Sequence, residues 1–379
     1  MNKNKQKYKI CMLATVHDSP FNIRVFHKEA KSLSNVGYDV SIISQHKGRE
    51  TVDRIKIIPI PKPKNRFHRM TVIAFLALYK AMQERPDVYH LHSPEQLPIG
   101  IILKFLTNKK VVYDVHEDFP KDFLTKEWIP NLFRKPISIA FKIFQNLISN
   151  FLDYIIAATP SISKNFPQSK TTVVNNYPFM ELTNLIKQNY DRKEDKYSLI
   201  FAGDLSEERG IYELIQSLEF VDQRLNVRLI LIGRICNKNF EKRIKELKTF
   251  SKVELIPWVP FSKVVEYYEK SDIGVVVYLP RPNHMEAMPN KLFEFMAAGL
   301  PVIASNFLLW KKIVEDNQCG ITVNPSNPRD IARGINYLLL NPDQKKKMGI
   351  NGRLAVIEKY NWEKEREKLI RVYDILLPR

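Results

Sequence analysis

The sequence predicts an α/β protein of two domains, each built on a doubly wound parallel sheet. Its 379 residues exceed what one hydrophobic core usually supports. Short β-branched runs alternate with segments of helical periodicity, and this alternation starts afresh in the second half of the chain. A wholly polar stretch, residues 190–196 (YDRKEDK), separates the two series and is typical of a linker.

The predicted elements follow from β-branched runs and from apolar residues at helical spacing. In the first half the expected strands are 9–15, 39–44, 55–60, 87–92, 111–116 and 154–158, with helices over 25–36 and 72–82. In the second half the expected strands are 199–202, 227–232, 253–256, 273–278 and 301–304, with helices over 208–220, 238–250, 261–270 and 290–298. These series predict an N-terminal domain over residues 1–190 and a C-terminal domain over residues 191–362.

A strongly charged helix is predicted after the second sheet is complete, over Trp362–Leu377. Its apolar stripe consists of Leu369, Val372, Leu376 and Leu377. Because that stripe must pack on another element, we expect residues 363–379 to cross back to the N-terminal domain. Ligands of open parallel sheets bind beyond the carboxyl ends of the strands, so two such sheets predict a cleft between the domains.

The chain carries a formal net charge of +18, concentrated in its first half. Residues 1–200 hold 31 Lys and Arg against 18 Asp and Glu, an excess of 13, whereas residues 201–379 hold 28 against 23, an excess of 5. Basic proteins of this kind meet nucleic acids, anionic lipids or phosphorylated small molecules. A generally basic proteome gives the same charge without any specific partner.

The sequence carries no features expected of a secreted or membrane-spanning chain. The three cysteines, Cys11, Cys236 and Cys319, lie far apart without a CxxC pair, which favours a reducing cytosol. The basic N-terminus has a short apolar run and no small-residue cleavage site, so it is interpreted as a first strand with a leader. The most apolar stretch, residues 137–152, is interrupted by Lys142 and four polar residues, so no spanning helix is predicted. We therefore expect a cytoplasmic protein.

The most informative segment is His284–Ser305, HMEAMPNKLFEFMAAGLPVIAS. Pro289 and Gly299 suit the start and the end of a helix, which places Glu294 in its first turns. A carboxylate there can accept two hydroxyl groups of a ribose, while the helix N-terminus faces an anionic phosphate. The alternative is an exposed glutamate on an amphipathic helix. The apolar neighbours of Glu294 leave it little solvated surface, and a buried carboxylate needs a partner.

An arginine and three histidines are further candidates. Arg209 follows a strand and precedes a glycine and a helix, where a guanidinium and backbone N–H groups can hold a diphosphate; the alternative is a surface pair with a neighbouring glutamate. His116 ends a strand beside Glu117 and can shuttle a proton, donate a hydrogen bond to a hydroxyl or be a structural residue whose hydrogen bonds are satisfied within the protein. His90 and His92 share one face of a strand. His92 lies nearer the end of that strand and is expected to reach the cleft.

The sequence resembles glycosyltransferase family 4 in five blocks that cover nearly the whole chain in order. The segment with Glu286 and Glu294, which are separated by seven residues, is similar to the branch of that family that reads PNKLFEYMAAGxPVIAS. The other blocks are HDSPFNIRVFHKEAKSLSNVGYDVSII (17–43), HLHSPEQLPIG (90–100), VVYDVHEDFP (111–120) and FAGDLSEERGIYELI (201–215). A lone E-x₇-E spacing is a weak signal, whereas five ordered blocks make the resemblance specific.

The resemblance implies the GT-B fold, two Rossmann-like domains facing a cleft. It implies a retaining, metal-independent glycosyltransferase of the hexosyltransferase type, using a nucleotide-diphosphate sugar with UDP favoured, and no cofactor. His116 and Glu286 would act at the transferred sugar. The donor would be held by Gly203, Arg209, Asn290, Lys291 and Glu294, and the acceptor side by His17, Arg24, His92 and Glu117. No DxD motif is present, so cations and helix N-termini must stabilise the departing diphosphate.

Three positions depart from the pattern of the family. Met288 and Pro289 stand where many members have a glycine after the first glutamate, and Pro289 has no N–H to offer a sugar hydroxyl. Asp204 stands where many members have an arginine, so one of the usual diphosphate cations is missing and Lys291 is the candidate replacement. Asn22 stands where an aspartate is common.

Two basic stretches that contain aromatic residues, Pro61–Met70 and Lys126–Lys142, lie in the N-terminal domain, the acceptor side in this family. They suit an anionic membrane surface; the alternative is a helix packed on its sheet with lysines reaching into water. The favoured function is sugar transfer to a glycan or lipid-linked acceptor in cell-surface polysaccharide biosynthesis, by an enzyme peripheral on the inner face of the plasma membrane. The alternatives are a GT-B nucleotide-sugar epimerase or hydrolase without a separate acceptor, and a nucleic-acid-binding protein. The last ranks lowest because the sequence has no nucleic-acid-binding motif, and no nucleic-acid partner is expected.

Overall fold

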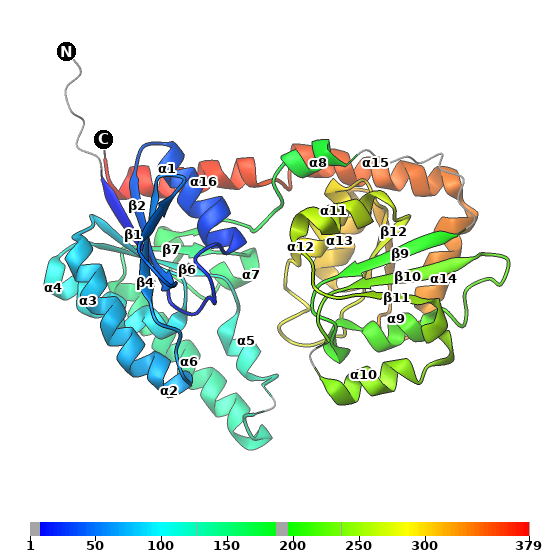
Figure 1. The fold of residues 1–379 in the computed structure, drawn as a ribbon, viewed down its shortest axis with the longest axis horizontal. Coiled ribbons are helices and arrows are strands. Elements are labelled where there is room, and N and C mark those ends of the chain that lie inside the picture. The colour runs from blue at the N-terminus through cyan, green and yellow to red at the C-terminus, as the bar shows by residue number, and fades with distance from the viewer. Residues whose placement is uncertain (1–7, 127, 187–195, 236, 379) are drawn as a thin grey trace, which may run out of the picture. The chain divides into compact units, whose positions relative to one another are not determined.

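The structure of the chain is a computed structural model that describes residues 8–126, 128–186, 196–235 and 237–378. It divides into two compact units: unit 1 is Met1–Asn176 with Lys364–Arg379, and unit 2 is Tyr177–Glu363. Each unit is built on one largely parallel sheet with helices on both faces, so the two α/β domains of the prediction are present (Figure 1). Of the predicted linker, only Lys196 lies among the described residues.

Unit 1 contains an eight-stranded sheet in the order β3-β4-β2-β1-β5-β6-β7-β8. Its neighbouring strands are parallel, apart from the antiparallel pair of β3 and β4. The short edge strand β3 was not predicted, because its three residues are mostly exposed and carry no apolar run. The strands are β1 (Lys9–Ala14), β2 (Asp39–Gln45), β3 (Glu50–Val52), β4 (Ile55–Ile60), β5 (Val88–Leu91), β6 (Lys110–Val115), β7 (Tyr154–Ala157) and β8 (Thr171–Val173).

The two faces of this sheet differ in chemistry. The face toward α3, α4 and α6 carries the apolar core, with Leu13, Leu91 and Tyr113 among its members. The opposite face carries polar groups under η1 and the C-terminal helix α16, including Asp114 and His90. The helices of unit 1 are η1 (Ile23–Ala30), α1 (Lys31–Asn35), α2 (Arg66–His68), η2 (Arg69–Ile73), α3 (Ala74–Glu84), η3 (Pro94–Gln96), α4 (Leu97–Thr107), α5 (Phe119–Phe123), α6 (Asn131–Phe151), α7 (Pro160–Ser163), η4 (Gln168–Lys170) and α16 (Trp362–Leu376).

The C-terminal helix α16 packs on unit 1 from Lys364 onward. Leu369, Val372 and Leu377 of its predicted stripe are buried, and Leu376 is half-buried. The hydroxyl of Tyr373, also on this helix, forms a hydrogen bond of 2.7 Å with Nδ1 of the buried His90. Unit 1 is therefore assembled from both ends of the chain.

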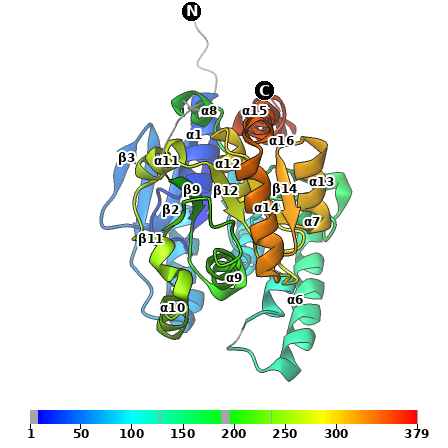
Figure 2. The ribbon, with the colours of Figure 1, turned by 90° about the vertical axis from the view of Figure 1, so that its right-hand side faces the viewer.

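Unit 2 contains a six-stranded sheet, parallel throughout, in the order β11-β10-β9-β12-β13-β14. Helices α9 and α10 lie on one side of it and α11, α12 and α13 on the other (Figure 1, Figure 2). The strands are β9 (Tyr197–Ala202), β10 (Val227–Ile232), β11 (Val253–Ile256), β12 (Ile273–Val276), β13 (Val302–Ser305) and β14 (Gly320–Val323). The helices are α8 (Glu181–Leu185), η5 (Glu207–Arg209), α9 (Ile211–Ser217), α10 (Lys238–Lys245), η6 (Lys248–Lys252), α11 (Phe261–Glu269), α12 (Asn290–Ala297), α13 (Leu308–Asp316), α14 (Pro328–Leu340) and α15 (Pro342–Glu358).

The division between the units falls after Asn176, before the boundary expected at residue 190. Tyr177, Leu182 and Ile186 belong to the apolar core of unit 2. The ring of Tyr177 lies 4.7 Å from that of Phe293 on α12. The segment that precedes β9 is therefore part of the second unit, because its apolar side chains are buried there.

Candidate active site

Both sheets reverse their strand order between two neighbouring strands, β1 and β5 in unit 1 and β9 and β12 in unit 2. Open α/β sheets bind their ligands at such a point, beyond the carboxyl ends of the strands. Gly203 directly follows β9, and His92 directly follows β5. The residues around these two positions are therefore the candidates for binding and catalysis.

Glycines allow a close approach of backbone and side chains at the end of β9. Gly203 and Gly233 have φ of +144° and +149°, a region that residues with a side chain rarely adopt. A Cβ on Gly233 would lie 1.8 Å from the carbonyl oxygen of Gly203. A Cβ on Gly203 would lie 2.9 Å from Nη1 of Arg209 and 3.8 Å from Cε of Lys291. Arg209 and Lys291, both predicted donor ligands, therefore border the same backbone position.

Arg209 ends the turn η5, just before α9. Its guanidinium lies 5.5 Å from the ring of Tyr278, and its Nη2 forms an ion pair with Asp204 at 3.3 Å. Glu207, one of the neighbours considered as its surface partner, pairs with Arg243 instead, at 3.0 Å. The guanidinium is thus held at the end of the sheet, with an exposed carboxylate in front of it.

Helix α12 brings three predicted donor residues together. Asn290 is its first residue, after the N-cap Pro289, and Lys291 and Glu294 follow within the first turns. Glu294 is only 9% exposed, and its Oε2 accepts hydrogen bonds from the Tyr268 hydroxyl and from Lys291 Nζ, each at 2.9 Å. Burial first, and then the charge of Glu294, raise the pKa of Tyr268 well above its ordinary value, so the phenol keeps its proton and donates.

Glu286 lies on the loop between β12 and α12, and its side chain is exposed. The indole N–H of Trp310 donates to the carbonyl oxygen of Ala287 at 2.7 Å. The ring of His284 lies 5.2 Å from that of Tyr278, the same aromatic ring that Arg209 approaches. These contacts fix the loop on both sides of Glu286 and tie it to the neighbourhood of the two cations.

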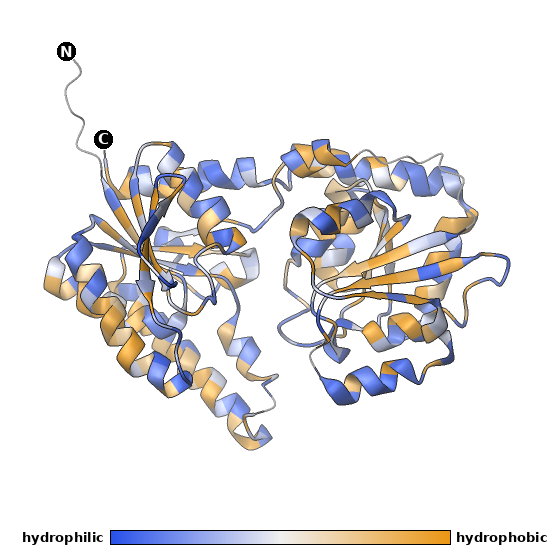
Figure 3. Ribbon diagram, in the orientation of Figure 1, coloured by the Kyte–Doolittle hydropathy of each residue, from blue (hydrophilic) through white to orange (hydrophobic). Residues whose placement is uncertain are grey.

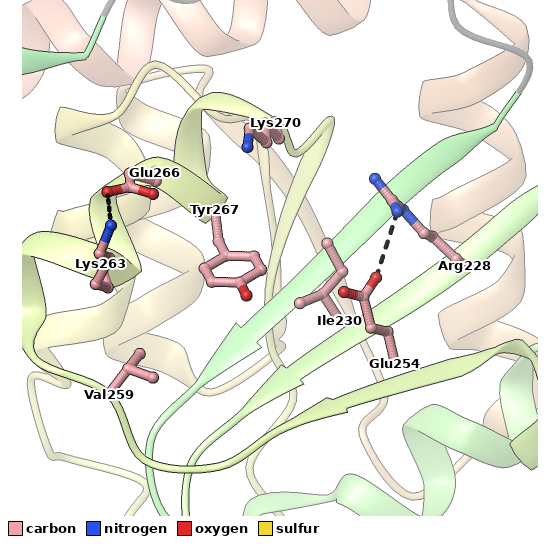
Figure 4. Close-up of a pocket in the computed structure, with 8 residues that line it drawn as sticks. All are labelled: Arg228, Ile230, Glu254, Val259, Lys263, Glu266, Tyr267 and Lys270. Carbon is pink, nitrogen blue, oxygen red and sulfur yellow. Dashed lines mark hydrogen bonds and ion pairs between the residues drawn. The ribbon is translucent and has the colours of Figure 1, made fainter.

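A pocket of about 570 Å³ lies elsewhere in unit 2, between α11 and the strands β10 and β11 (Figure 4). Two of its cations face carboxylates: Arg228 pairs with Glu254 at 3.3 Å and Lys263 with Glu266 at 2.7 Å. None of the predicted donor residues lines it. The candidate donor site is therefore the glycine-bordered end of β9, not this pocket.

Unit 1 holds a buried charge cluster on the polar face of its sheet. Arg24 of η1 donates from Nη2 and Nε to the two carboxylate oxygens of Asp114 on β6, at 2.7 and 3.0 Å, and from Nη1 to the carbonyl of Val174 at 3.0 Å. Nε also lies 2.9 Å from Oε1 of Glu29. Arg24, Asp114 and Glu29 are at most 4% exposed. A single guanidinium thus serves two buried carboxylates.

The two carboxylates of this cluster respond to their surroundings in opposite ways. Burial, reinforced by the charge of Asp114, raises the pKa of Glu29 well above its ordinary value. Burial also acts to raise the pKa of Asp114, but Arg24 and His116 outweigh it and hold that pKa well below its ordinary value. Glu29 therefore holds its proton more strongly than a free glutamic acid does, whereas Asp114 gives up its proton more readily than a free aspartic acid.

Histidines surround the ionised Asp114. His116, which follows β6, has its Nε2 2.5 Å from Oδ2 of Asp114. His92 has its Nδ1 3.4 Å from the same oxygen and 3.4 Å from Nε2 of His116. His17 stacks beside them, with its ring 6.2 Å from that of His116. Burial lowers the pKa of His17 and His92 to about 4 and that of His90 well below its ordinary value, so these three rings are neutral near pH 7.

The structure thus places the predicted acceptor-side residues unevenly. Arg24 and His92 are buried, and the contacts described above join them to groups of the protein itself. His116 and His17 are half-buried, and Glu117, which follows His116, is exposed. His116 is therefore the member of the cluster whose ring meets both the buried carboxylate and the surface.

Four side chains of this cluster have the chemistry of metal ligands. One ligand atom each from Glu29, His90, His92 and Asp114 lies within 4.8 Å of the others. Arg24 lies within ion-pair distance of both carboxyl groups, so the protein itself already places a positive charge beside them. A divalent cation there would have to share its carboxylates with a guanidinium, so the residues present do not fit a metal site.

Four residues of these sites are not predicted from the sequence alone: Asp114, Glu29, Tyr268 and Tyr373. Asp114 could have been found, because it lies two residues before His116 and must share its strand face. The other three come from separate elements, the helices η1, α11 and α16. Only the folded chain brings their polar atoms to the predicted residues.

Comparison with known proteins follows the same division of the chain. The family profile described as Glycosyltransferase Family 4 matches residues 24–176, and the profile described as Glycosyl transferases group 1 matches residues 183–355. Together the two profiles cover most of both units. The chain belongs to glycosyltransferase family 4.

This glycosyltransferase is similar to characterised and solved relatives along nearly its whole length. It is 25% identical over 390 residues to the capsular polysaccharide biosynthesis glycosyltransferase CapM of Staphylococcus aureus, with 97% of each chain covered. The crystal structure of a glycosyltransferase from Rickettsia africae superposes with a TM-score of 0.75 at 20% identity, covering 99% of this chain and 100% of that one. HepE of Anabaena in complex with UDP-glucose gives 0.72 at 14% identity, covering 97% and 99%. The enzyme has the GT-B fold.

Proposed function

We propose that this glycosyltransferase moves a sugar from a nucleotide-diphosphate sugar, with UDP favoured, to a glycan or lipid-linked acceptor of cell-surface polysaccharide biosynthesis. The observation that carries the proposal is the meeting of Arg209 and Lys291 at Gly203, with Glu294 on the same helix as Lys291. HepE, a structural neighbour, was crystallised with UDP-glucose, which supports the choice of donor. CapM is named for capsular polysaccharide biosynthesis, which supports the class of acceptor.

In this proposal the donor residues bind different parts of the nucleotide. Tyr268 and Lys291 both bond to Oε2 of Glu294, so we assign its other oxygen, Oε1, to the ribose hydroxyls. Arg209 and Lys291 take the diphosphate, where a guanidinium and an ammonium neutralise the charge that develops as the nucleotide departs. Because these two cations supply that charge, the transfer needs no metal ion in this proposal. Asn290, at the start of α12, adds an N–H at the helix N-terminus.

Each unit contributes one residue for which we propose a role toward the sugar, Glu286 in unit 2 and His116 in unit 1. Glu286 is assigned to the hydroxyls of the donor sugar, and His116 to the sugar that is transferred. Asp114 bonds to the His116 ring and so fixes its orientation. Arg24 and His92 are buried, so in this proposal they position Asp114 and His116 and do not touch the acceptor. Transfer proceeds with retention, the acceptor attacking on the face from which the diphosphate leaves, without a nucleophile from the enzyme.

The same proposal places the enzyme in the cytoplasm, peripheral on the inner face of the plasma membrane. Its excess of 13 positive charges in residues 1–200 favours a surface of anionic lipid. Within the described residues, no helix combines the length and the hydrophobicity that crossing a bilayer requires.

Calorimetry with UDP and with uridine tests the donor site. Arg209→Ala and Lys291→Ala should each weaken UDP binding about ten- to a hundredfold, because a charged hydrogen bond contributes roughly 1.5–3 kcal/mol. Uridine lacks the diphosphate and should bind all variants alike. If both cations touch one diphosphate, the double variant should deviate from additivity. Lys263→Ala, which removes a lysine paired with Glu266 on α11, is the control and should leave UDP affinity unchanged.

Turnover of the donor with and without acceptors separates transfer from its alternative. A transferase should release UDP faster when a suitable glycan or lipid-linked acceptor is added. An epimerase or hydrolase should consume the donor at the same rate in either case. Equal loss of UDP and uridine affinity in Lys291→Ala would remove Lys291 from the diphosphate site.

A further inference from the structure

Helix α6 buries polar residues and exposes apolar ones, the reverse of an ordinary surface helix. Its buried residues are polar: Ser138, Gln145 and Ser149. Its exposed residues are largely apolar, with Leu132 exposed to 79% and Leu147 to 60%. Amphipathic helices of globular proteins normally bury their apolar stripe against the core. This helix turns the stripe outward, which indicates that something other than its own sheet covers it.

The exposed apolar surface continues over two neighbouring segments. Helix α4 contacts both α3 and α6, so the three lie side by side on one face of the unit 1 sheet (Figure 1), and Figure 3 shows hydrophobic residues along α3 and α6. Phe67 of α2 and Phe75 of α3 are exposed to 78% and 72%. We call the whole set the apolar face: Phe67, Met70, Val72, Phe75, Tyr79, Phe105, Leu106, Trp128, Leu132, Phe133, Ile137, Ile139, Ile143, Phe144, Leu147 and Phe151.

The segments that carry the apolar face are almost purely basic. Residues 61–84 hold five Lys or Arg, residues 97–110 three and residues 131–151 three, against a single acidic residue, Glu84. Glu84 is itself paired with Arg49. The guanidinium of Arg66 lies 4.6 Å over the ring of Trp128, an aromatic and basic pair of the kind found at membrane interfaces.

Charge decides between the two occupants that such a face could take. Four of these cations, Arg69, Lys104, Lys109 and Lys110, pair with carboxylates of neighbouring elements, and the others leave an excess of positive charge. In a twofold dimer the same patch would meet itself, so this excess would face an equal excess. A bilayer with anionic headgroups instead offers hydrocarbon to the apolar side chains and negative charge to the basic ones. The combination of exposed apolar residues with a basic surround therefore favours lipid.

We propose that the apolar face inserts into the headgroup and acyl boundary of an anionic membrane and holds unit 1 on it. The inference rests on the proposed peripheral location and deepens it, because attachment is then apolar as well as electrostatic. The polar cluster with Asp114 and His116 lies on the opposite face of the same sheet, so the sheet separates the membrane contact from the candidate chemistry. Lipid binding should consequently survive salt that would abolish purely electrostatic attachment.

Vesicle flotation in 0.5 M salt tests the proposal, with vesicles of phosphatidylcholine alone and with phosphatidylglycerol added. The full chain should float with the anionic vesicles and keep most of that binding at high salt. The triple variant Phe75→Ser, Leu132→Ser and Leu147→Ser should bind at least about tenfold more weakly. A matched triple variant in unit 2, Leu308→Ser, Leu340→Ser and Leu354→Ser, also replaces exposed apolar residues and should bind like the parent.

The readouts keep this inference separate from the donor site. UDP affinity and melting temperature should be unchanged in both triple variants, which shows that the fold and the donor site are intact. In a Trp258→Phe background, Trp128 emission should shift to the blue when anionic vesicles are added. The proposal is overturned if the unit 1 triple variant floats like the parent, or if the parent does not bind anionic vesicles, whether or not it forms a dimer that this variant disrupts. Failure of the parent to bind UDP would count against the proposed function and not against the membrane face.

Discussion

Asp204 is expected to weaken donor binding, so Asp204→Asn should make the enzyme bind UDP more tightly. The carboxylate forms an ion pair with Arg209 at 3.3 Å and is 61% exposed. Breaking an exposed pair costs about 0.2–1 kcal/mol, which the diphosphate must offset before it engages the guanidinium. The carboxylate also repels the diphosphate itself: two unit charges 6 Å apart interact by roughly 0.7 kcal/mol in a water-like dielectric. The two effects act in the same direction and sum to about 1–2 kcal/mol, or a five- to thirtyfold lower Kd.

Titration calorimetry with UDP and uridine at low and high salt checks this reasoning. The gain should be absent with uridine and should shrink at 0.5 M salt, because both effects are electrostatic and partly exposed. Asp222→Asn is the matched control: it also removes a carboxylate paired with an arginine, Arg224, but it precedes β10 and so lies at the opposite end of the sheet. An unchanged or weaker UDP affinity in Asp204→Asn, or an equal gain for uridine, would refute the assignment of Arg209 to the diphosphate.

Three further predictions follow from the buried contacts. Glu294→Ala should lower UDP affinity by about ten- to a hundredfold and uridine affinity equally, since the ribose is common to both; calorimetry in which only UDP binding suffers would contradict the ribose assignment. Burial lowers the pKa of His92 to about 4, so between pH 4 and 6.5 the ring takes up a proton when the protein unfolds. The free energy of unfolding should therefore rise with pH over this range, by up to about 1.4 kcal/mol per pH unit. His92→Gln should flatten that slope. The raised pKa of Glu29 favours the folded state at low pH and so opposes this rise of the free energy of unfolding, but Glu29 is present in the parent and in His92→Gln alike. If chemical denaturation gives the two proteins the same dependence of unfolding free energy on pH, His92 is not its source. Tyr373→Phe should lower the free energy of unfolding by about 1–3 kcal/mol, because it leaves the buried Nδ1 of His90 without its hydrogen-bond partner. Hydrogen exchange should speed up in unit 1 while unit 2 keeps its rates; a uniform change would argue against a local role.

Many strands and helices could be predicted because the periodicity of apolar residues and the local residue composition depend only on neighbouring positions in the sequence. Each predicted strand is present with its ends within two residues, since buried parallel strands are nearly continuous β-branched runs. Helix α6 (Asn131–Phe151) was anticipated only as one alternative for residues 126–142, and its bounds were not predicted, for a physical reason. Its buried positions are Ser138, Gln145 and Ser149, so the sequence offered no conventional apolar stripe facing the core. Strand β3 escaped because three mostly exposed residues leave no pattern.

The site was predictable where one segment carries several of its members. Lys291 and Glu294 are three residues apart on α12, and their hydrogen bond follows from helical spacing. Long-range partners were not accessible in that way: the Tyr268 hydroxyl reaches Glu294 from another helix, and Arg24 reaches Asp114 across 90 residues of sequence. Such contacts depend on the strand order, which local patterns do not encode.

The packing of α16 on unit 1 also has a consequence for the folding of the chain during its translation. His90 leaves the ribosome early, whereas Tyr373, its hydrogen-bond partner, is synthesised 283 residues later. Until then the nascent N-terminal half lacks a helix that covers its polar face, and its buried charges remain open to water. A chain interrupted before Lys364 would keep those charges exposed to water, so unit 1 is complete only once α16 has been made.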